Sequence, residues 1–191
     1  MIKMKSLFLN PALGFVELSS IANGYVVSDA MVKKAPVHLV LSEPTSSGKY
    51  LIMISGSVAS VHESLKIAME VSEGFLLDEF FIPQLHSEVV NYLNGQLKTQ
   101  KNLEALSIIE TKTVASSIYA GDAALKEAQV QLVDLQLGRG IGGKGYFVLS
   151  GKLFDVQAAH AAALKSIESK GTLVRSEIVT STHEDIRQLC I

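Results

Sequence analysis

The hydrophobic pattern at the start of the chain predicts a strand followed by a helix. Residues 13–18 are mostly apolar and end at two serines, which suit the start of a helix. In residues 21–34, small and apolar side chains return every four positions, as they do along one narrow helix face: Ala22, Val26 and Ala30. A proline two residues later would end that helix.

The pattern that follows predicts a β-hairpin, a second helix, a fourth strand and a short last helix. Residues 37–41 alternate as a strand, residues 42–48 are polar, and residues 50–55 are strongly apolar, so the chain reverses direction at a glycine-containing turn. An amphipathic helix, a strand over 76–82 and a helix over 86–94 complete the order β-α-β-β-α-β-α. This order is the split βαβ or ferredoxin-like plan.

The same pattern occurs a second time, so the chain contains two copies of one domain. Residues 12–40 and 105–133 align without gaps and are identical at 11 of 29 positions. A polar segment, 94–102, separates the copies and is interpreted as a linker. We therefore expect an α/β (α+β) fold of two tandem ferredoxin-like domains, one over 1–96 and one over 103–191.

Composition limits the functions that this architecture can serve. A domain of about 90 residues buries only about 60–65% of its unfolded surface, so association of domains or chains would add stability. The chain is 48% apolar with a mean hydropathy of +0.29, yet no apolar run approaches the roughly 20 residues that cross a bilayer, which predicts a soluble protein. A net charge of −2 and the absence of Trp argue against nucleic acid as a partner.

The chain ends and the single cysteine carry no functional signal. Residues 1–10 contain two lysines but too short an apolar stretch for a secretory signal, no small-residue cleavage site follows, and they are interpreted as a short cytoplasmic extension. Cys190 is the only cysteine, which excludes a disulfide framework and a cysteine-rich metal site, and it is expected to be a passive thiol.

A glycine-rich segment, Gly138–Gly145, matches two phosphate-binding motifs but not their context. Both motifs work because the loop leads into a helix whose free N–H groups face the anion, whereas this loop leads into an apolar strand. A glycine also stands where the P-loop needs a hydroxyl for magnesium. We interpret the segment as a flexible turn.

No arrangement of residues predicts catalysis or metal binding. The five histidines lack ligand spacing, and His86 and His183, which are repeat equivalents, are expected to cap the last helices. Glu17 and Glu110 recur in an otherwise apolar strand and are expected to be paired or half-exposed. The sequence therefore predicts that the chain is not an enzyme.

Each copy also carries an acid and a lysine four residues apart on the first helix. These are Asp29 with Lys33 and Asp122 with Lys126. Such pairs form i,i+4 ion pairs on a helix surface, and a solvated salt bridge is the simplest interpretation.

Several repeated motifs give the chain a resemblance to a known family. They are A-L-G-F-V-E-L at the start of the first copy, S-D-A-M-V-K-K-A and G-D-A-A-L-K-E-A on the first helices, S-S-G-K and G-G-K after the second strands, and I-P-Q-L-H-S-E-V near the end of the first copy. Over residues 12–187 the chain resembles tandem-domain bacterial microcompartment shell proteins. The unpermuted order of elements resembles the trimeric, single-layer type.

The resemblance implies a homotrimer that forms a pseudohexameric tile in a microcompartment shell of the bacterial cytoplasm, beside other hexameric and pentameric shell proteins. It implies a central pore for small polar metabolites, lined by two loops. The pore-lining residues expected from the resemblance are Thr45, Ser46, Ser47, Gly48, Arg139, Gly140, Ile141, Gly142 and Gly143. The residues expected at tile edges are Asp29, Lys33, Asp122, Lys126, Gln84, His86, Ser181 and His183.

The chain departs from the family at two places. In a subclass typified by the propanediol-utilisation shell, a pore-loop cysteine holds an iron–sulfur cluster, and Ser46 stands at that position here, so we expect an open pore and no cofactor. The arginine of the family's I-P-R-P-H edge motif corresponds to Gln84 and Ser181, which removes a charged donor from the edge.

The second copy has two extra residues in its loop, which reduces a sixfold ring of loops to threefold symmetry. If Arg139 faces the pore, three guanidinium groups would favour anions. Two other functions stay open from the sequence: a ferredoxin-like small-molecule-binding protein with an anion at residues 139–144, and an electron-transfer protein with a cluster held by other ligands.

Overall fold

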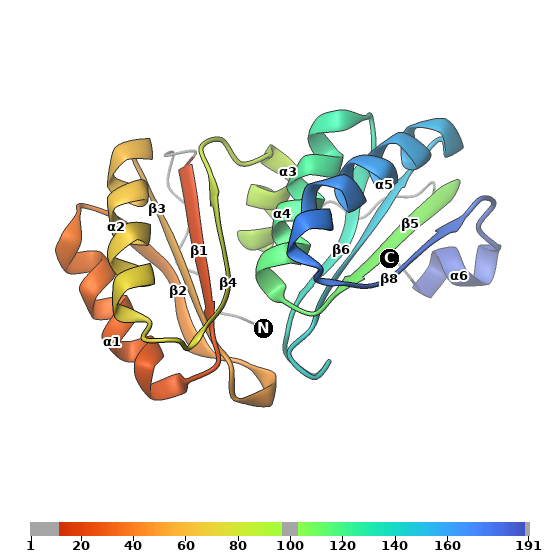
Figure 1. Ribbon diagram of the computed structural model, residues 1–191. Coiled ribbons are helices and arrows are strands. Elements are labelled where there is room, and N and C mark those ends of the chain that lie inside the picture. The colour runs from red at the N-terminus through yellow and green to blue at the C-terminus, as the bar shows by residue number, and fades with distance from the viewer. Residues whose placement is uncertain (1–11, 97–102, 190–191) are drawn as a thin grey trace. The chain divides into compact units, whose positions relative to one another are not determined.

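The computed structural model describes residues 12–96 and 103–189, which form two compact units (Figure 1). Unit 1 contains the chain up to Leu85 together with Gly138–Gly143, and unit 2 contains His86–Leu137 and the chain from Lys144 onward. The expected N-terminal extension, Cys190 and most of the expected linker lie outside the described residues.

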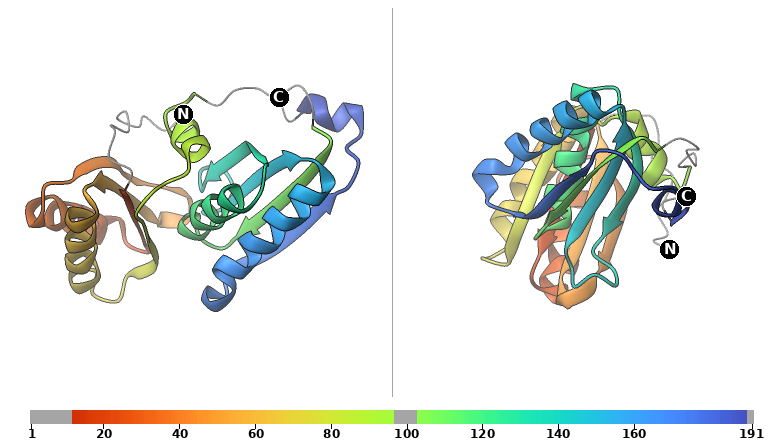
Figure 2. Two further views of the ribbon diagram at one scale, coloured as in Figure 1. Left: turned by 90° about the horizontal axis from the view of Figure 1, so that it is seen from above. Right: turned by 90° about the vertical axis from the view of Figure 1, so that its right-hand side faces the viewer.

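Unit 1 is a four-stranded antiparallel sheet with two helices on one face (Figures 1 and 2). The strand order is β2-β3-β1-β4, so β2 and β4 are the two edges. Its elements are β1 (Ala12–Leu18), α1 (Ile21–Lys34), β2 (His38–Pro44), the 3₁₀ turn η1 (Ser46–Gly48), β3 (Tyr50–Gly56), α2 (Val58–Val71) and β4 (Leu76–Ile82).

Unit 2 repeats this plan, with strand order β6-β7-β5-β8 and edges β6 and β8. Its elements are α3 (Ser87–Leu93), β5 (Ala105–Thr111), α4 (Val114–Glu127), β6 (Gln131–Leu137), β7 (Gly145–Gly151), α5 (Leu153–Ile167), the 3₁₀ turn η2 (Glu168–Lys170), β8 (Leu173–Val179) and α6 (Glu184–Leu189). The predicted order β-α-β-β-α-β-α and the ferredoxin-like fold are confirmed in both copies.

Two segments pack with a unit other than the one that their repeat would suggest. Helix α3 follows β4 in the chain, yet it packs on α4 and β6 of unit 2, and the loop Gly138–Gly143 groups with unit 1. The division by contacts therefore differs from the division by sequence repeat.

Local sequence explains where the helices begin. The hydroxyl of Ser20 accepts a hydrogen bond from the N–H of Asn23, and Ser57 does the same at the start of α2, as does Thr113 at the start of α4. In unit 1 the core lies between the helices and the sheet, and the central strands β1 and β3 are buried at every position. No helix within 12–96 or 103–189 combines the length and the apolar character that crossing a bilayer requires.

Candidate functional site

The loops at the two hairpin ends come together in unit 1. The first loop, Ser46–Gly48, is a 3₁₀ turn in which Ser47 and Gly48 adopt left-handed φ angles of 61° and 70°. The second is the loop Gly138–Gly143, which belongs to the same compact unit. All nine residues that the resemblance placed at the pore lie in or directly beside these two loops.

Three hydrogen bonds join the loops. The N–H of Gly140 donates to Ser46 Oγ at 3.0 Å, Ser47 Oγ donates to the carbonyl of Gly142 at 2.9 Å, and Lys49 Nζ donates to the carbonyl of Gly143 at 2.7 Å. A Cβ at position 143 would lie 2.7 Å from the carbonyl oxygen of Ser46, and φ there is 74°. Glycine is therefore required at this close approach.

The cations of the loop cluster are neutralised by carboxylates. Arg139 Nη2 lies 2.8 Å from Glu43 Oε1, and Lys49 Nζ lies 2.7 Å from Glu17 Oε1. If Arg139 faces the pore, its guanidinium group is predicted to favour anions. Because Glu43 balances it, the two loops contribute little net charge.

The donor set of the loops does not fit an iron–sulfur cluster. Such clusters are held by cysteine thiolates, and the loops offer hydroxyls and backbone groups instead. The oxygen of Ser46 already accepts the N–H of Gly140. Within the described ranges, no three histidine or carboxylate side chains gather as a metal ion would require.

The repeated glutamates are both paired, as predicted. Glu17 is fully buried with Lys49, whereas Glu110 is half-exposed and lies 2.6 Å from Lys144 Nζ. The loop Gly138–Gly143 leads into strand β7 and not into a helix, which agrees with the interpretation that it is not a phosphate-binding loop.

The acid–lysine pairs on α1 and α4 form as predicted but in different surroundings. Lys33 and Asp29 are both exposed and 2.6 Å apart, whereas Asp122 is buried beside Lys126. The buried Asp122 also accepts the backbone N–H of His86 at 2.7 Å. The structure therefore brings His86, Asp122 and Lys126 together in unit 2.

The predicted capping role of the two repeated histidines is confirmed. His86 Nδ1 accepts the N–H of Glu88, and His183 Nδ1 accepts the N–H of Asp185, both at 3.3 Å. Gln84 and Ser181 are exposed residues just after β4 and β8.

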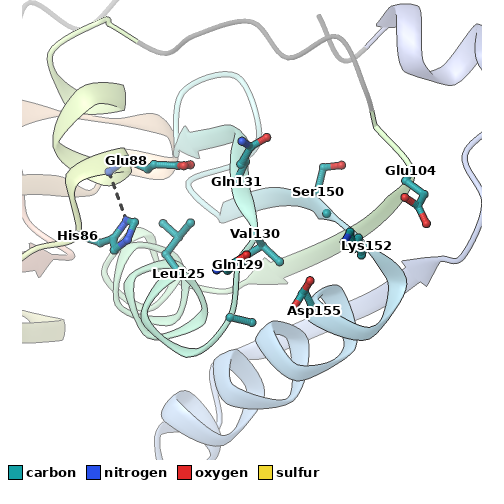
Figure 3. Close-up of a pocket in the computed structure, with 12 residues that line it drawn as sticks. His86, Glu88, Glu104, Leu125, Gln129, Val130, Gln131, Ser150, Lys152 and Asp155 are labelled. Atoms are coloured by element: carbon teal, nitrogen blue, oxygen red, sulfur yellow. Dashed lines mark hydrogen bonds between the residues drawn. The ribbon is translucent and has the colours of Figure 1, made fainter.

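A cavity of about 590 Å³ lies beside the His86 contact in unit 2 (Figure 3). His86 and Glu88 border one side, and Lys152 and Asp155 at the start of α5 border another. The sequence carried no signal for this cavity, because its lining comes from four separate segments of the chain.

A polar pair between β5 and α5 was also missed from the sequence. Ser107 Oγ lies 2.8 Å from His160 Nδ1, and burial lowers the pKa of His160, an effect that Glu177 partly opposes. A comparison of the two copies could have revealed this pair, because the equivalent positions in the first copy hold Gly14 and Leu65, which cannot form it.

Comparisons with known proteins agree with the fold and with both copies. The family model of the BMC domain matches residues 12–85 and again 105–182. The bacterial microcompartment shell protein PduT of Citrobacter freundii is 35% identical over 178 residues, which cover 93% of this chain and 96% of that protein. The shell protein EutM of Escherichia coli strain K12 is 32% identical over 88 residues, which cover 46% of this chain and 88% of EutM.

Two solved structures are similar over most of the chain. A microcompartments protein from Desulfitobacterium hafniense DCB has a TM-score of 0.79 at 35% identity, covering 94% of this chain and 99% of that one. The fused permuted shell protein MSM0275 of the RMM microcompartment has a TM-score of 0.68 at 20% identity, covering 88% and 87%, which shows the fold alone. With both copies matched by one family model, this chain belongs to the BMC-domain family.

Proposed function

We propose that the chain is a structural tile of a bacterial microcompartment shell. The observation that carries this proposal is the pair of BMC domains whose hairpin loops meet in one hydrogen-bonded cluster. The relatives named above are shell proteins, so the function assigned is structural and not enzymatic. The site of action is the shell, in the bacterial cytoplasm.

The tile is a homotrimer that approximates a hexamer. Two domains of one fold occupy two of six positions around an axis, so three chains close the ring through head-to-tail contacts. Other hexameric and pentameric shell proteins are the neighbours of this tile.

The loop cluster lines the central pore, through which small polar metabolites pass. Thr45–Gly48 and Arg139–Gly143 offer hydroxyls and backbone groups that can replace water around a polar solute. Because Glu43 balances Arg139, selection depends on size and hydrogen bonding more than on charge.

The tile edges include the lysine at the end of each first helix. Lys33 is largely exposed, and Lys126 is half-exposed above a buried carboxylate. Their alkyl stems can pack against a neighbouring tile while the ammonium groups reach backbone carbonyls. Gln84 and Ser181 complete the edges with neutral donors.

The two alternative functions receive no support from the site. An anion at residues 139–144 would need free cations, but Arg139 and Lys144 are each paired with a glutamate. An electron-transfer centre would need ligands that the loops do not contain.

Assembly state tests the proposal. Sedimentation of the purified chain is expected to give the mass of three chains, and co-expression with hexameric and pentameric shell proteins is expected to give closed shells that contain it in electron micrographs. A chain that stays monomeric at high concentration, or is left out of shells that form without it, would overturn the proposal.

A further inference from the structure

We propose that Asn94, at the end of α3, is a site of spontaneous deamidation by the backbone of the next residue. The backbone nitrogen of Gly95 attacks the side-chain amide of Asn94, and the asparagine becomes aspartate or isoaspartate. The modification changes the chemistry of the chain itself and does not depend on the proposed tile.

The reaction needs only the chain and water. The nitrogen of Gly95 forms a bond to Cγ of Asn94, the bond between Cγ and Nδ2 breaks, and ammonia leaves with the proton of the backbone amide. Water then opens the cyclic imide at either carbonyl, which gives an aspartate or an isoaspartate carboxylate. Glycine favours the attack because it has no Cβ beside the attacking nitrogen.

The dipeptide Asn-Gly occurs twice in the chain, as Asn23–Gly24 and as Asn94–Gly95. In an unfolded chain the reaction is open to both. In the folded chain the two dipeptides differ in what must open before the glycine nitrogen can reach the side chain. The structure therefore decides which asparagine reacts.

At Asn94, the attack requires the last turn of α3 to open. Asn94 is the C-cap of this helix and has a ψ angle of 1°, and Gly95 has a left-handed φ angle of 69°. The N–H of Gly95 donates to the carbonyl of Tyr92 at 2.9 Å, and the N–H of Gln96 donates to the carbonyl of Asn91 at 2.7 Å. These two bonds form a Schellman cap, and rotation about ψ of Asn94 breaks both.

Opening this turn disturbs little of unit 2. Gly95 and Gln96 are exposed, and Asn94 is half-buried. A Cβ added at Gly95 would meet no atom within 4 Å, so the space around the glycine is open. The terminal turn of a helix opens locally at a small fraction of the free energy of global unfolding. Asn94 can therefore rotate while the sheet and α4 stay folded.

At Asn23, packing blocks the same reaction. The N–H of Gly24 donates to the carbonyl of Ser20 at 3.1 Å, and Asn23 Nδ2 donates to the carbonyl of Val71 at 3.3 Å. Gly24 is buried on α1, so close to β3 that a Cβ would lie 2.2 Å from the ring of Tyr50. Rotation of the backbone at Asn23 would have to separate α1 from the sheet.

The product alters the end of α3 in two ways. A carboxylate at position 94 places a negative charge at the C-terminal end of the helix, where the helix dipole disfavours it. Isoaspartate also routes the main chain through the side-chain carbon, which removes the geometry of the cap. Deamidation is therefore expected to loosen α3 from α4 and β6, the elements on which it packs in unit 2.

Mass spectrometry of the aged protein tests the inference. The purified full chain is kept folded in a mildly alkaline buffer, in which the attacking nitrogen loses its proton more readily, and samples are digested with trypsin over time. Cleavage after lysines places the two dipeptides in separate peptides, 6–33 and 67–98. Asn94 is expected to gain one mass unit at least about tenfold faster than Asn23, and chromatography should separate aspartate and isoaspartate forms.

Two controls tie the result to the fold. In guanidinium chloride, where both dipeptides are unfolded, the two rates are expected to converge. Asn94→Gln keeps an amide at the end of α3, but its attack would have to close a larger ring, so position 94 should stay unmodified. Equal rates at Asn23 and Asn94 in the folded chain would overturn the inference, as would a difference that persists unchanged in the denaturant.

Discussion

At the residue scale, the two equivalent ion pairs of the repeats differ in burial and therefore in energy. Lys49→Ala removes the ammonium beside the fully buried Glu17 and is expected to lower the free energy of unfolding by about 3–5 kcal/mol. Lys144→Ala removes the same contact from the more exposed Glu110 and is expected to cost about 1 kcal/mol or less. Urea unfolding measures the free energy of unfolding of both variants, and equal losses would contradict the argument that burial separates the two ion pairs.

His160 predicts a pH dependence of stability. Burial lowers its pKa in the folded chain below the ordinary value of 6.5, so the unfolded chain binds a proton more readily. This contribution to stability is present above pH 6.5 and is lost as the pH falls from there through the lowered pKa. Unfolding free energies measured from pH 7.5 to about pH 5 should fall less steeply for His160→Gln. His62→Gln, at an exposed histidine, should keep the steeper slope.

At the element scale, both copies bring the first helix close to a strand, but the glycine that allows it lies on the helix in one copy and on the strand in the other. In the first copy, Gly24 on α1 leaves room for the ring of Tyr50 on β3. In the second copy, Ser117 on α4 fills the equivalent space above Gly145 on β7. Each helix can approach its sheet because one member of the pair has no side chain.

Gly24→Ala therefore tests the close approach of helix and strand. An added Cβ would lie 2.2 Å from the ring of Tyr50, so the variant is expected to lose about 1–3 kcal/mol of stability despite the helix preference of alanine. Gly121→Ala is the matched control, because its Cβ would meet Phe147 at an ordinary 3.7 Å. Thermal unfolding compares them, and a stabilised Gly24→Ala variant would contradict the packing argument.

The contacts of the hairpin loops predict the charge preference of the proposed pore. Glu43→Gln leaves Arg139 without its carboxylate partner, so release of small anions from loaded shells should rise by about tenfold at low salt relative to cations. The double variant with Arg139→Gln should restore the original ratio. Unchanged ratios in the single variant would mean that this pair lies away from the path of the solute.

At the scale of the whole molecule, assembly has two separable levels. The proposed function separates the contacts between chains within a tile from the proposed contacts of Lys33 and Lys126 between tiles. Lys33→Ala with Lys126→Ala is expected to leave trimers intact in sedimentation while extended sheets disappear from electron micrographs. Lys66→Ala, in an exposed pair with Glu63, is the control, and sheets that persist without Lys33 and Lys126 would remove these residues from the edge.

The elements of the fold were predictable because their signals are local. Helical spacing over 21–34, the serine before it and the alternation after it all act within a few residues, and the observed α1 has the predicted limits. The hairpin extended further than expected, since β2 continues to Pro44 through residues that are polar. Pairing with β3 extends β2 as far as Pro44, and an edge strand such as β2 tolerates proline and polar side chains.

The contacts of the site were not predictable in the same way. The pairing of Arg139 with Glu43 joins residues 96 positions apart, and the Ser46 hydroxyl meets Gly140 across 94. Neither pair has a local signature. The resemblance to the family identified the loops, but the structure alone showed that the guanidinium is balanced.

The sequence by itself determined that the chain contains two copies of one fold. Periodicity and helix capping are properties of short segments, so their repetition can be recognised directly in the sequence. Only the tertiary structure decided which of two equivalent polar residues finds a hydrogen-bond partner elsewhere in the chain and which stays exposed. Asp29 and Asp122 stand at equivalent positions of two 14-residue helices, yet only Asp122 accepts a backbone N–H. The reason is that the partner arrives from a distant segment, whose position depends on how the sheets and helices pack.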